Sequence, residues 1–309
     1  MKKINLFILS GILLATLACQ PPKKEEDTGM KLWYSSPAEI WADAFPLGNG
    51  HLAAMCSGGL TSERYQINEE SLWAGTQVNP YAENFYDNLQ KIQEMVFAGD
   101  RIKAHDFGVE NLTVEPTSFR SYQPFADLTI EFQHDNPATG YKRTLDMADG
   151  VCIVSYRTAG TEFVRESFIS AVDDVLCIKL TAKGDELLSC RIGLSREKDI
   201  KVQALPNSQL HLDGQIVDDE SPDAFDDNPG GSGPGGEHLR FAGRLACKAP
   251  GGTVSTDQDQ LVVQGAREIT LMLSAATDYD LSKLHYNRSI DPGARAQQIL
   301  DRAVGKSWQ

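Results

Sequence analysis

The side chains that could carry out chemistry are numerous but scattered along the sequence. The six histidines stand apart from one another: His51, His105, His134, His211, His238 and His285. The sequence contains no paired-histidine metal motif, phosphate-binding loop, dinucleotide fingerprint or Gly-x-Ser-x-Gly nucleophile elbow. Its 43 Asp and Glu residues offer acid and base groups throughout, and their spacing singles out no pair. We therefore expect no metal and no cofactor, and the residue types alone indicate no particular reaction.

Five cysteines beyond the N-terminal segment are the other reactive groups: Cys56, Cys152, Cys177, Cys190 and Cys247. None of them forms a Cys-x-x-Cys pair, so the usual zinc and redox motifs are absent from the sequence. Cys152, Cys177 and Cys190 lie within strand-like apolar runs, which favours buried thiols that pack as small apolar side chains. A single disulfide is the alternative, because the N-terminus indicates export.

The charge balance excludes one class of partner. The chain has 29 Lys and Arg residues against 43 Asp and Glu residues, a net charge of −14. Such a chain repels phosphate backbones and anionic lipid head groups. We expect no nucleic-acid partner, and contact with a membrane only through a lipid anchor. With 41% hydrophobic and 23% charged residues, the composition is that of a globular protein with a sizeable core.

Residues 1–19 have the pattern of an export signal. Lys2 and Lys3 precede an apolar stretch that ends at Ala18 and is shorter than the roughly 20 residues of a membrane-spanning helix. The sequence Thr-Leu-Ala-Cys19 resembles the cleavage site of a bacterial lipoprotein, which predicts lipidation of Cys19. Thr16 stands where leucine is preferred, so secretion to the periplasm in soluble form is the alternative. Residues 20–30 are polar and predict a flexible tether, which would hold the protein at a membrane, periplasmic or on the cell surface.

The remaining elements predict a mainly β fold, a large antiparallel β-sandwich of the super-sandwich type. Short strand-like runs are separated by turn residues, in a chain with 26 Gly and 14 Pro. Apolar residues at helical spacing predict a helical insertion near 82–107, interrupted by Gly99. A second helical pattern follows Pro292. The strand-like runs are His51–Met55, Glu63–Ile67, Leu128–Phe132, Cys152–Tyr156, Phe163–Phe168, Val175–Leu180, Leu187–Ile192, Gln209–Val217, Leu239–Cys247, Gln260–Val263 and Ile269–Ala275.

Between these strands, residues 218–237 are first acidic and then rich in Gly and Pro. This composition predicts a solvated loop. Calcium binding is the alternative, because carboxylate oxygens are abundant, although their spacing matches no calcium-binding loop.

Several blocks in the N-terminal third resemble a known enzyme family. They are Leu-Trp-Tyr-Ser-Ser-Pro-Ala-Glu-Ile-Trp41, Pro-Leu-Gly-Asn-Gly-His51, Gly58-Gly59, Asn68-Glu-Glu-Ser-Leu-Trp-Ala-Gly75, Asn79-Pro80, Tyr122-Gln-Pro-Phe-Ala-Asp-Leu-Thr-Ile130 and Tyr141-x-Arg-x-Leu-Asp146. In this order, the blocks resemble the opening of glycoside hydrolase family 95. The resemblance begins near Leu32 and continues to the end, with gaps around residues 218–237.

This resemblance implies an exo-acting α-L-fucosidase that removes terminal α-1,2-linked L-fucose from glycans, although some members prefer α-L-galactose. The family architecture is an N-terminal β-sandwich, a helical linker, an (α/α)6 catalytic barrel and a C-terminal β domain. Hydrolysis is inverting, with an acid and a base about 6.5–9.5 Å apart on opposite faces of the sugar. On this basis we expect the sandwich at residues 31–288 and the start of the linker at residues 289–309. The barrel motifs are not matched, so we expect no catalytic residue in this chain, which would then be a fragment.

Five polar and aromatic residues of the matched blocks are candidates for facing the barrel or the rim of its sugar pocket: Asn49, His51, Asn68, Glu69 and Trp73. The alternative for each is structural, with the Asn and Glu side chains holding local backbone and Trp73 in the core. The expected partners are a fucosylated glycan, bound through the barrel, and the barrel itself. Two other functions stay open. One is a stand-alone, non-catalytic module for sugar binding or assembly at the cell surface. The other is kinship with disaccharide phosphorylases, which the export signal disfavours.

Overall fold

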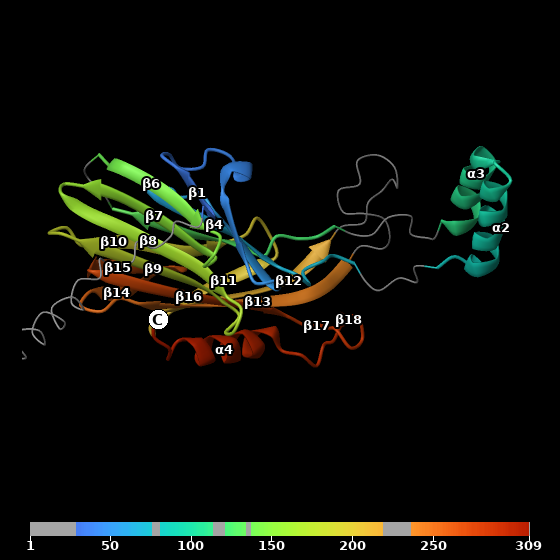
Figure 1. Cartoon of the computed structure of the whole chain (residues 1–309). Coiled ribbons are helices and arrows are strands. Elements are labelled where there is room, and N and C mark those ends of the chain that lie inside the picture. The colour runs from blue at the N-terminus through green and yellow to red at the C-terminus, as the bar shows by residue number, and fades with distance from the viewer. Residues whose placement is uncertain (1–28, 76–80, 114–120, 134–136, 219–235, 309) are drawn as a thin grey trace, which may run out of the picture.

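The computed structural model describes residues 29–75, 81–113, 121–133, 137–218 and 236–308. Within them the chain is mainly β, as predicted, and two antiparallel sheets stack face to face (Figure 1). The larger sheet has nine strands in the order β1-β6-β7-β8-β9-β16-β13-β12-β11. The smaller sheet has seven strands in the order β14-β15-β10-β5-β4-β3-β2. A short hairpin, Tyr279–Asp280 (β17) with His285–Tyr286 (β18), stands beside them.

The nine-stranded sheet consists of Lys31–Tyr34 (β1), Thr139–Asp146 (β6), Val151–Thr158 (β7), Thr161–Ser170 (β8), Val175–Lys183 (β9), Glu268–Thr277 (β16), Gly236–Lys248 (β13), Gln209–Asp218 (β12) and Ile200–Leu205 (β11). The seven-stranded sheet consists of Thr253–Asp257 (β14), Gln260–Ala266 (β15), Leu188–Ser195 (β10), Ala126–Phe132 (β5), Ser62–Glu69 (β4), Leu52–Cys56 (β3) and Phe45–Gly48 (β2). A single 3-10 turn, Trp41–Asp43 (η1), follows β1.

Alternating side chains create the core between the sheets. Along β8 every second residue is buried, and β5 has nearly the same alternation. Successive side chains of a strand point to opposite faces, so one face of each sheet lines the interior and the other meets solvent. Aromatic residues from the two sheets meet there, with the rings of Phe125 and Phe241 edge to face at 5.7 Å. All five described cysteines are buried free thiols, which confirms the predicted burial of Cys152, Cys177 and Cys190.

The C-terminal helix Pro292–Ala303 (α4) lies along the outer face of the nine-stranded sheet, next to β13 and β16 (Figure 1). Asp291 caps its N-terminus by accepting a hydrogen bond from the Ala294 amide at 3.1 Å. Its buried residues Ile299, Leu300 and Ala303 form a second apolar cluster with residues of β9, β13 and β16. Because α4 covers the outer face, β9 and β16 are buried on both sides over most of their length. The predicted C-terminal helix therefore packs as a third layer on the nine-stranded sheet.

The predicted helical insertion consists of two helices, Phe85–Phe97 (α2) and Arg101–Leu112 (α3). It extends beyond the expected end at residue 107. Gly99 adopts a φ of +87° between the two helices, a conformation that glycine accommodates without strain. No residue of α2 is fully buried, and Phe97 is 88% exposed. Among the described residues, no helix is long and apolar enough to cross a membrane.

Candidate functional site

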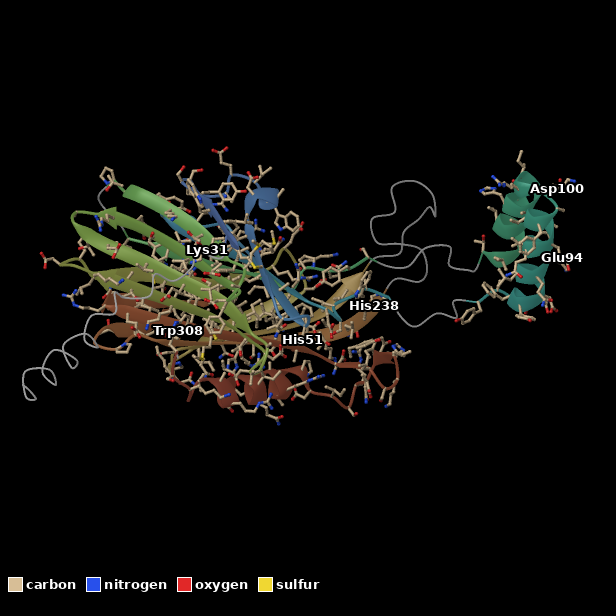
Figure 2. All side chains as sticks on the ribbon, viewed as in Figure 1. Lys31, His51, Glu94, Asp100, His238 and Trp308 are labelled. Carbon is tan, nitrogen blue, oxygen red and sulfur yellow. The ribbon has the colours of Figure 1, made fainter. Side chains whose placement is uncertain are left out.

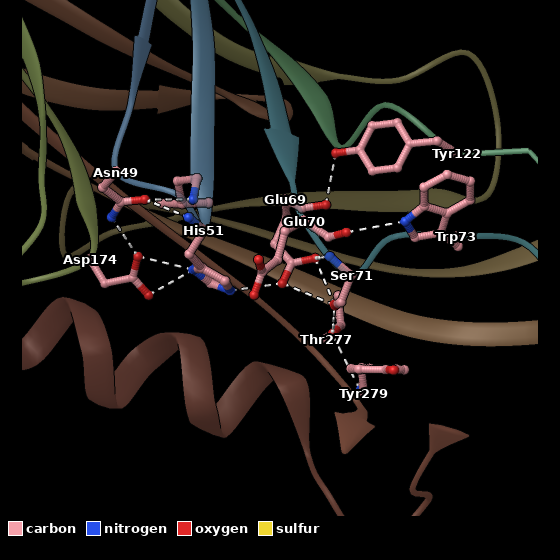
Figure 3. A network of polar contacts seen from close by, with 11 residues as sticks. Asn49, His51, Glu69, Glu70, Ser71, Trp73, Tyr122, Asp174, Thr277 and Tyr279 are labelled. Atoms are coloured by element: carbon pink, nitrogen blue, oxygen red, sulfur yellow. Dashed lines mark hydrogen bonds and ion pairs between the residues drawn. The ribbon is translucent and has the colours of Figure 1, made fainter. Parts of the chain in front are cut away.

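Four of the five predicted site residues lie at one end of the sandwich (Figure 3). Asn49 and His51 belong to the turn between β2 and β3, and Glu69 is the last residue of β4. The pairing of Leu52 with Glu69 brings the turn and the strand end together. Trp73 follows four residues after Glu69. Figure 2 shows His51 beside α4, and Figure 3 shows the contacts in detail.

His51 is held between two carboxylates. Its Nε2 lies 2.8 Å from Glu69 Oε1, and its Nδ1 lies 2.8 and 3.0 Å from the two oxygens of Asp174 (Figure 3). The hydrogen bond with Asp174, followed by that with Glu69, raises the pKa of His51 to about 10, against an opposing effect of burial. The imidazole is thus protonated at neutral pH, which makes it a poor match for a general base near pH 7.

Asp174, which links His51 to the other sheet, was not among the predicted site residues. It lies in the turn between β8 and β9 and has a φ of +57°, which Asp tolerates better than most residues. Its pKa is lowered by hydrogen bonds from His51 and Asn49, against the effect of burial. The Asp-Asp sequence at 173–174, between two strand-like runs, was a turn signal, but nothing in it indicated the partner.

Asn49 forms hydrogen bonds with backbone groups and with Asp174. Its Oδ1 accepts hydrogen bonds from the amides of His51 and Leu52 at 2.9 and 2.8 Å. Its Nδ2 donates to the Ser170 carbonyl at 3.1 Å and to Asp174 Oδ1 at 2.9 Å. Asn49 therefore fixes the β2–β3 turn and also ties it to the nine-stranded sheet, as the structural alternative expected.

Glu69 is almost fully buried, and its carboxylate is fully engaged. Besides His51, it accepts hydrogen bonds from the Ser71 amide at 2.9 Å and from the Ser71 hydroxyl. The Ser71 hydroxyl also lies 2.6 Å from Thr277 Oγ1 on β16 (Figure 3). We call Asn49, His51, Glu69, Ser71, Asp174 and Thr277 the polar cluster. The cluster joins the ends of both sheets, with the His51 cation between the carboxylates of Glu69 and Asp174.

The structure does not bring Asn68 into the polar cluster. Asn68 pairs with Ala53 in the β3–β4 register and precedes Glu69, so its side chain points to the opposite face of the strand. It is half-buried. Sequence proximity to Glu69 was therefore a poor guide for this residue.

Trp73 is 49% exposed and borders a groove beside the polar cluster. Its indole nitrogen donates to the Glu70 carbonyl at 3.2 Å, and its ring meets Tyr122 edge to face at 5.2 Å (Figure 3). The groove has a volume of about 380 Å³. Its lining residues are Glu70, Ser71, Trp73, Ala74, Gly75, Leu239, Tyr279, Leu281, Leu284, His285 and Tyr286. Trp73 is thus a rim residue and not part of the core.

The groove combines aromatic surfaces with one carboxylate, that of Glu70, among its lining residues. Aromatic faces and a few polar groups suit a ligand with both apolar and hydroxyl surfaces, such as a sugar ring. Inverting hydrolysis needs two groups, an acid and a base, on opposite faces of the sugar. Among the described residues that line the groove, Glu70 is the only Asp or Glu. Within the described residues, no group of three or more His, Cys, Asp or Glu side chains is arranged to hold a metal ion.

Comparison with known proteins identifies the family of this chain. Residues 32–282 match the model described as "Glycosyl hydrolase family 65, N-terminal domain". The chain belongs to this family. The predicted recognition of a glycoside hydrolase N-terminal domain is thereby confirmed, although the matching model has the number 65 where the sequence resemblance indicated 95.

Two similar proteins are an α-fucosidase and a probable α-fucosidase. Alpha-L-fucosidase 2 of Arabidopsis thaliana is 28% identical over 81% of this chain and 30% of its own length. Probable alpha-fucosidase A of Aspergillus niger is 26% identical over 90% of this chain and 35% of its own length. The chain thus spans about a third of the length of these relatives. Among solved structures, a putative kojibiose phosphorylase from the human microbiome matches with a TM-score of 0.47 and 10% identity, over 90% of this chain and 36% of its own.

Proposed function

We propose that this chain is the N-terminal sandwich of an exported α-L-fucosidase of the family 95 type. In this proposal a helical barrel performs the inverting hydrolysis of terminal α-1,2-linked L-fucose, and the sandwich supports the barrel. The observation that carries the proposal is the similarity to two α-fucosidases across 81% and 90% of this chain. The groove also favours a supporting role for the sandwich and a catalytic role for the barrel. The described residues of its lining include one carboxylate, whereas inverting hydrolysis needs both an acid and a base.

The test is a chimaera. The stretch of the Arabidopsis α-L-fucosidase 2 that this chain matches is replaced by residues 31–309, and release of L-fucose from α-1,2-fucosylated lactose is measured. We expect the chimaera to release fucose, and this chain alone to release none. The Arabidopsis enzyme without its N-terminal stretch is the control for residual activity. A chimaera that melts cooperatively yet is no more active than this control contradicts the proposal.

Turnover by the isolated chain would also contradict it, provided that the activity survives repurification. The variant Glu70→Gln decides whether such turnover belongs to this chain, because Glu70 is the carboxylate that lines the groove. Activity lost in this variant would locate hydrolysis within the sandwich.

A second candidate function is a non-catalytic sugar-binding module, and the exposed Trp73 beside Tyr279 and Tyr286 favours it. Stacking of a sugar on Trp73 would change the tryptophan fluorescence in a saturable way. Trp33→Ala is the matched control, because Trp33 is 62% exposed on β1, away from the groove lining. Saturable binding of L-fucose that Trp73→Ala abolishes and Trp33→Ala preserves would support this second function. Absence of saturable binding would leave the supporting role as the function of the sandwich.

A further inference from the structure

Two cysteines from different sheets meet in the core. Cys56 ends β3 of the seven-stranded sheet, and Cys152 lies on β7 of the nine-stranded sheet. The Cys152 thiol donates a hydrogen bond to the Cys56 sulfur, with the two Sγ atoms 3.4 Å apart. Each residue is 1% exposed. The two residues are 96 positions apart in sequence, so only the packing of one sheet on the other brings them together.

The chain around Cys56 is held firmly in place. The buried Glu63 carboxylate accepts hydrogen bonds from the amides of Ser57 and Gly58, at 3.1 and 3.0 Å. Glu63 also pairs with the buried guanidinium of Arg165 on β8. Arg165 in turn donates to the Gly59 carbonyl at 3.0 Å, which ties the segment after Cys56 to the nine-stranded sheet. The sulfurs therefore stay neighbours in the folded protein.

We propose that Cys56 and Cys152 form a disulfide between the two sheets when the chain folds in the presence of a disulfide oxidant. Glutathione disulfide, or the disulfide of a thiol oxidoreductase, would be the oxidant. A disulfide bond is about 2.05 Å long. The sulfurs thus have to approach by somewhat over 1 Å from their present separation of 3.4 Å.

The exchange is balanced with one molecule of oxidised glutathione. One cysteine thiolate attacks the glutathione disulfide, forms a mixed disulfide and releases the first glutathione thiolate. The second cysteine thiolate then attacks the cysteine sulfur of the mixed disulfide and releases the second glutathione thiolate. The cysteine pair loses two electrons, glutathione gains them, and the two protons of the cysteine thiols end on the two glutathione thiols.

The folded structure delays this reaction once the sheets have closed. The thiolate is the attacking species, and both cysteines are buried away from an oxidant. The hydrogen bond with Cys152, together with burial, also raises the pKa of the Cys56 thiol. Oxidation therefore accompanies folding or a transient opening of the sandwich, and a native, reduced protein reacts slowly.

The experiment compares refolding with and without the oxidant. The full chain with Cys19→Ser is unfolded in urea with dithiothreitol and refolded in either glutathione disulfide or dithiothreitol. Free thiols are then alkylated, and the protein is digested with trypsin without reduction. Residues 32–64 and 144–157 are the tryptic peptides that hold Cys56 and Cys152. We expect them to appear as one linked species in the oxidised sample, at the summed mass less two hydrogens.

Thermal melting gives a second measurement. A cross-link between sequence positions this far apart restricts the unfolded chain, so we expect oxidation to raise Tm by roughly 5–10 °C. Cys56→Ala and Cys152→Ala should each lose this difference between oxidised and reduced samples. Cys177→Ala, which removes a buried thiol outside the pair, should keep it. Comparing the two redox states of one variant cancels the effect of the cavity that the substitution leaves.

Two outcomes would overturn the proposal. One is a refolded Cys19→Ser chain in which Cys56 and Cys152 are both alkylated after treatment with glutathione disulfide. The other is a linked species that joins Cys56 or Cys152 to a different cysteine. Because the peptide map needs only the Cys19→Ser chain, a Cys56 or Cys152 variant that fails to fold leaves the test intact.

Discussion

At the scale of single residues, the polar cluster shows how a conspicuous histidine serves structure. His51 contacts carboxylates on both sides, one from each sheet, and its positive charge interacts favourably with both Glu69 and Asp174. Glu69 is buried, so loss of the cation would leave a carboxylate without its compensating charge in the interior. The cluster therefore contributes to the attachment of one sheet end to the other.

The first prediction concerns the pH dependence that His51 gives to stability. Its pKa rises from 6.5 to about 10 on folding, so its stabilising contribution is complete below pH 6.5 and is lost as pH rises towards 10. His51→Gln should lower the free energy of unfolding by about 2–3 kcal/mol at pH 6. The difference between wild type and variant should shrink steadily between pH 6.5 and 10. Urea unfolding at a series of pH values measures it.

His105→Gln is the matched control, because His105 is exposed on α3. Its stability should follow that of the wild type at every pH. A wild-type minus His51→Gln difference that stays constant from pH 6 to 10 would show that the charge of His51 does not stabilise the fold. At acid pH the relevant group is Asp174, whose pKa is lowered in the folded protein. Its contribution to the free energy of unfolding is therefore complete above the ordinary pKa of an aspartate, and it is lost as the pH falls below that value.

At the scale of elements, α4 decides whether the nine-stranded sheet has one buried face or two. Val175 and Cys177 on β9 and Met272 on β16 face outwards from the sandwich core, and α4 buries them. Trp308, beyond the end of α4, meets Phe168 edge to face at 5.1 Å. The Ser274 hydroxyl adds a polar tie by donating to the Ala296 carbonyl at 2.8 Å. The helix is therefore an integral layer of the domain.

The second prediction tests this layer. Leu300 is fully buried between α4 and the sheet, so Leu300→Ala leaves a cavity and should destabilise the protein by about 3 kcal/mol. Gln298→Ala on the exposed face of the same helix should change stability by less than about 0.5 kcal/mol. The midpoint of urea unfolding measures both. Equal effects of the two substitutions would mean that α4 does not pack on the sheet.

At the scale of the whole molecule, export and anchoring remain proposals. Cys19 and the tether at residues 20–28 lie outside the described residues, as does the stretch 219–235 of the predicted acidic loop. The described part begins with β1, an edge strand whose four residues are all exposed. The net charge of −14 disfavours direct attachment to anionic lipid.

The third prediction tests the anchor. In a bacterial host, the wild-type chain should fractionate with membranes, and Cys19→Ala should move to the soluble fraction. Stable attachment takes more than one acyl chain, and bacterial lipoproteins carry several. Fractionation followed by mass spectrometry of the mature N-terminus measures this. A soluble wild-type protein whose N-terminus is not residue 19 would favour secretion in soluble form.

The amino-acid sequence was sufficient to predict the sandwich and both helical regions. The alternation of apolar and polar residues in strands, and the helical spacing of apolar residues, involve only residues that are close in sequence. Strands with one buried face, such as β5 and β8, were found from this pattern. The strands β1, β2, β6, β11, β14, β17 and β18 were not among the predicted runs. The edge strand β14 has no buried residue, and β11 has none either, so neither needs a regular apolar alternation.

Part of the candidate site could also be predicted locally. Asn49 and His51 lie in the turn that leads into β3, and Glu69 ends the neighbouring strand β4, so their proximity follows from the pairing of these two strands. The partners that define their role come from elsewhere: Asp174 is 123 positions from His51, and Thr277 is 206 positions from Ser71. The contact between Cys56 and Cys152 likewise exists only because the two sheets stack. Alternation and turns depend on neighbours in sequence, whereas contacts between layers depend on how the finished sheets pack, and only the tertiary structure decided them.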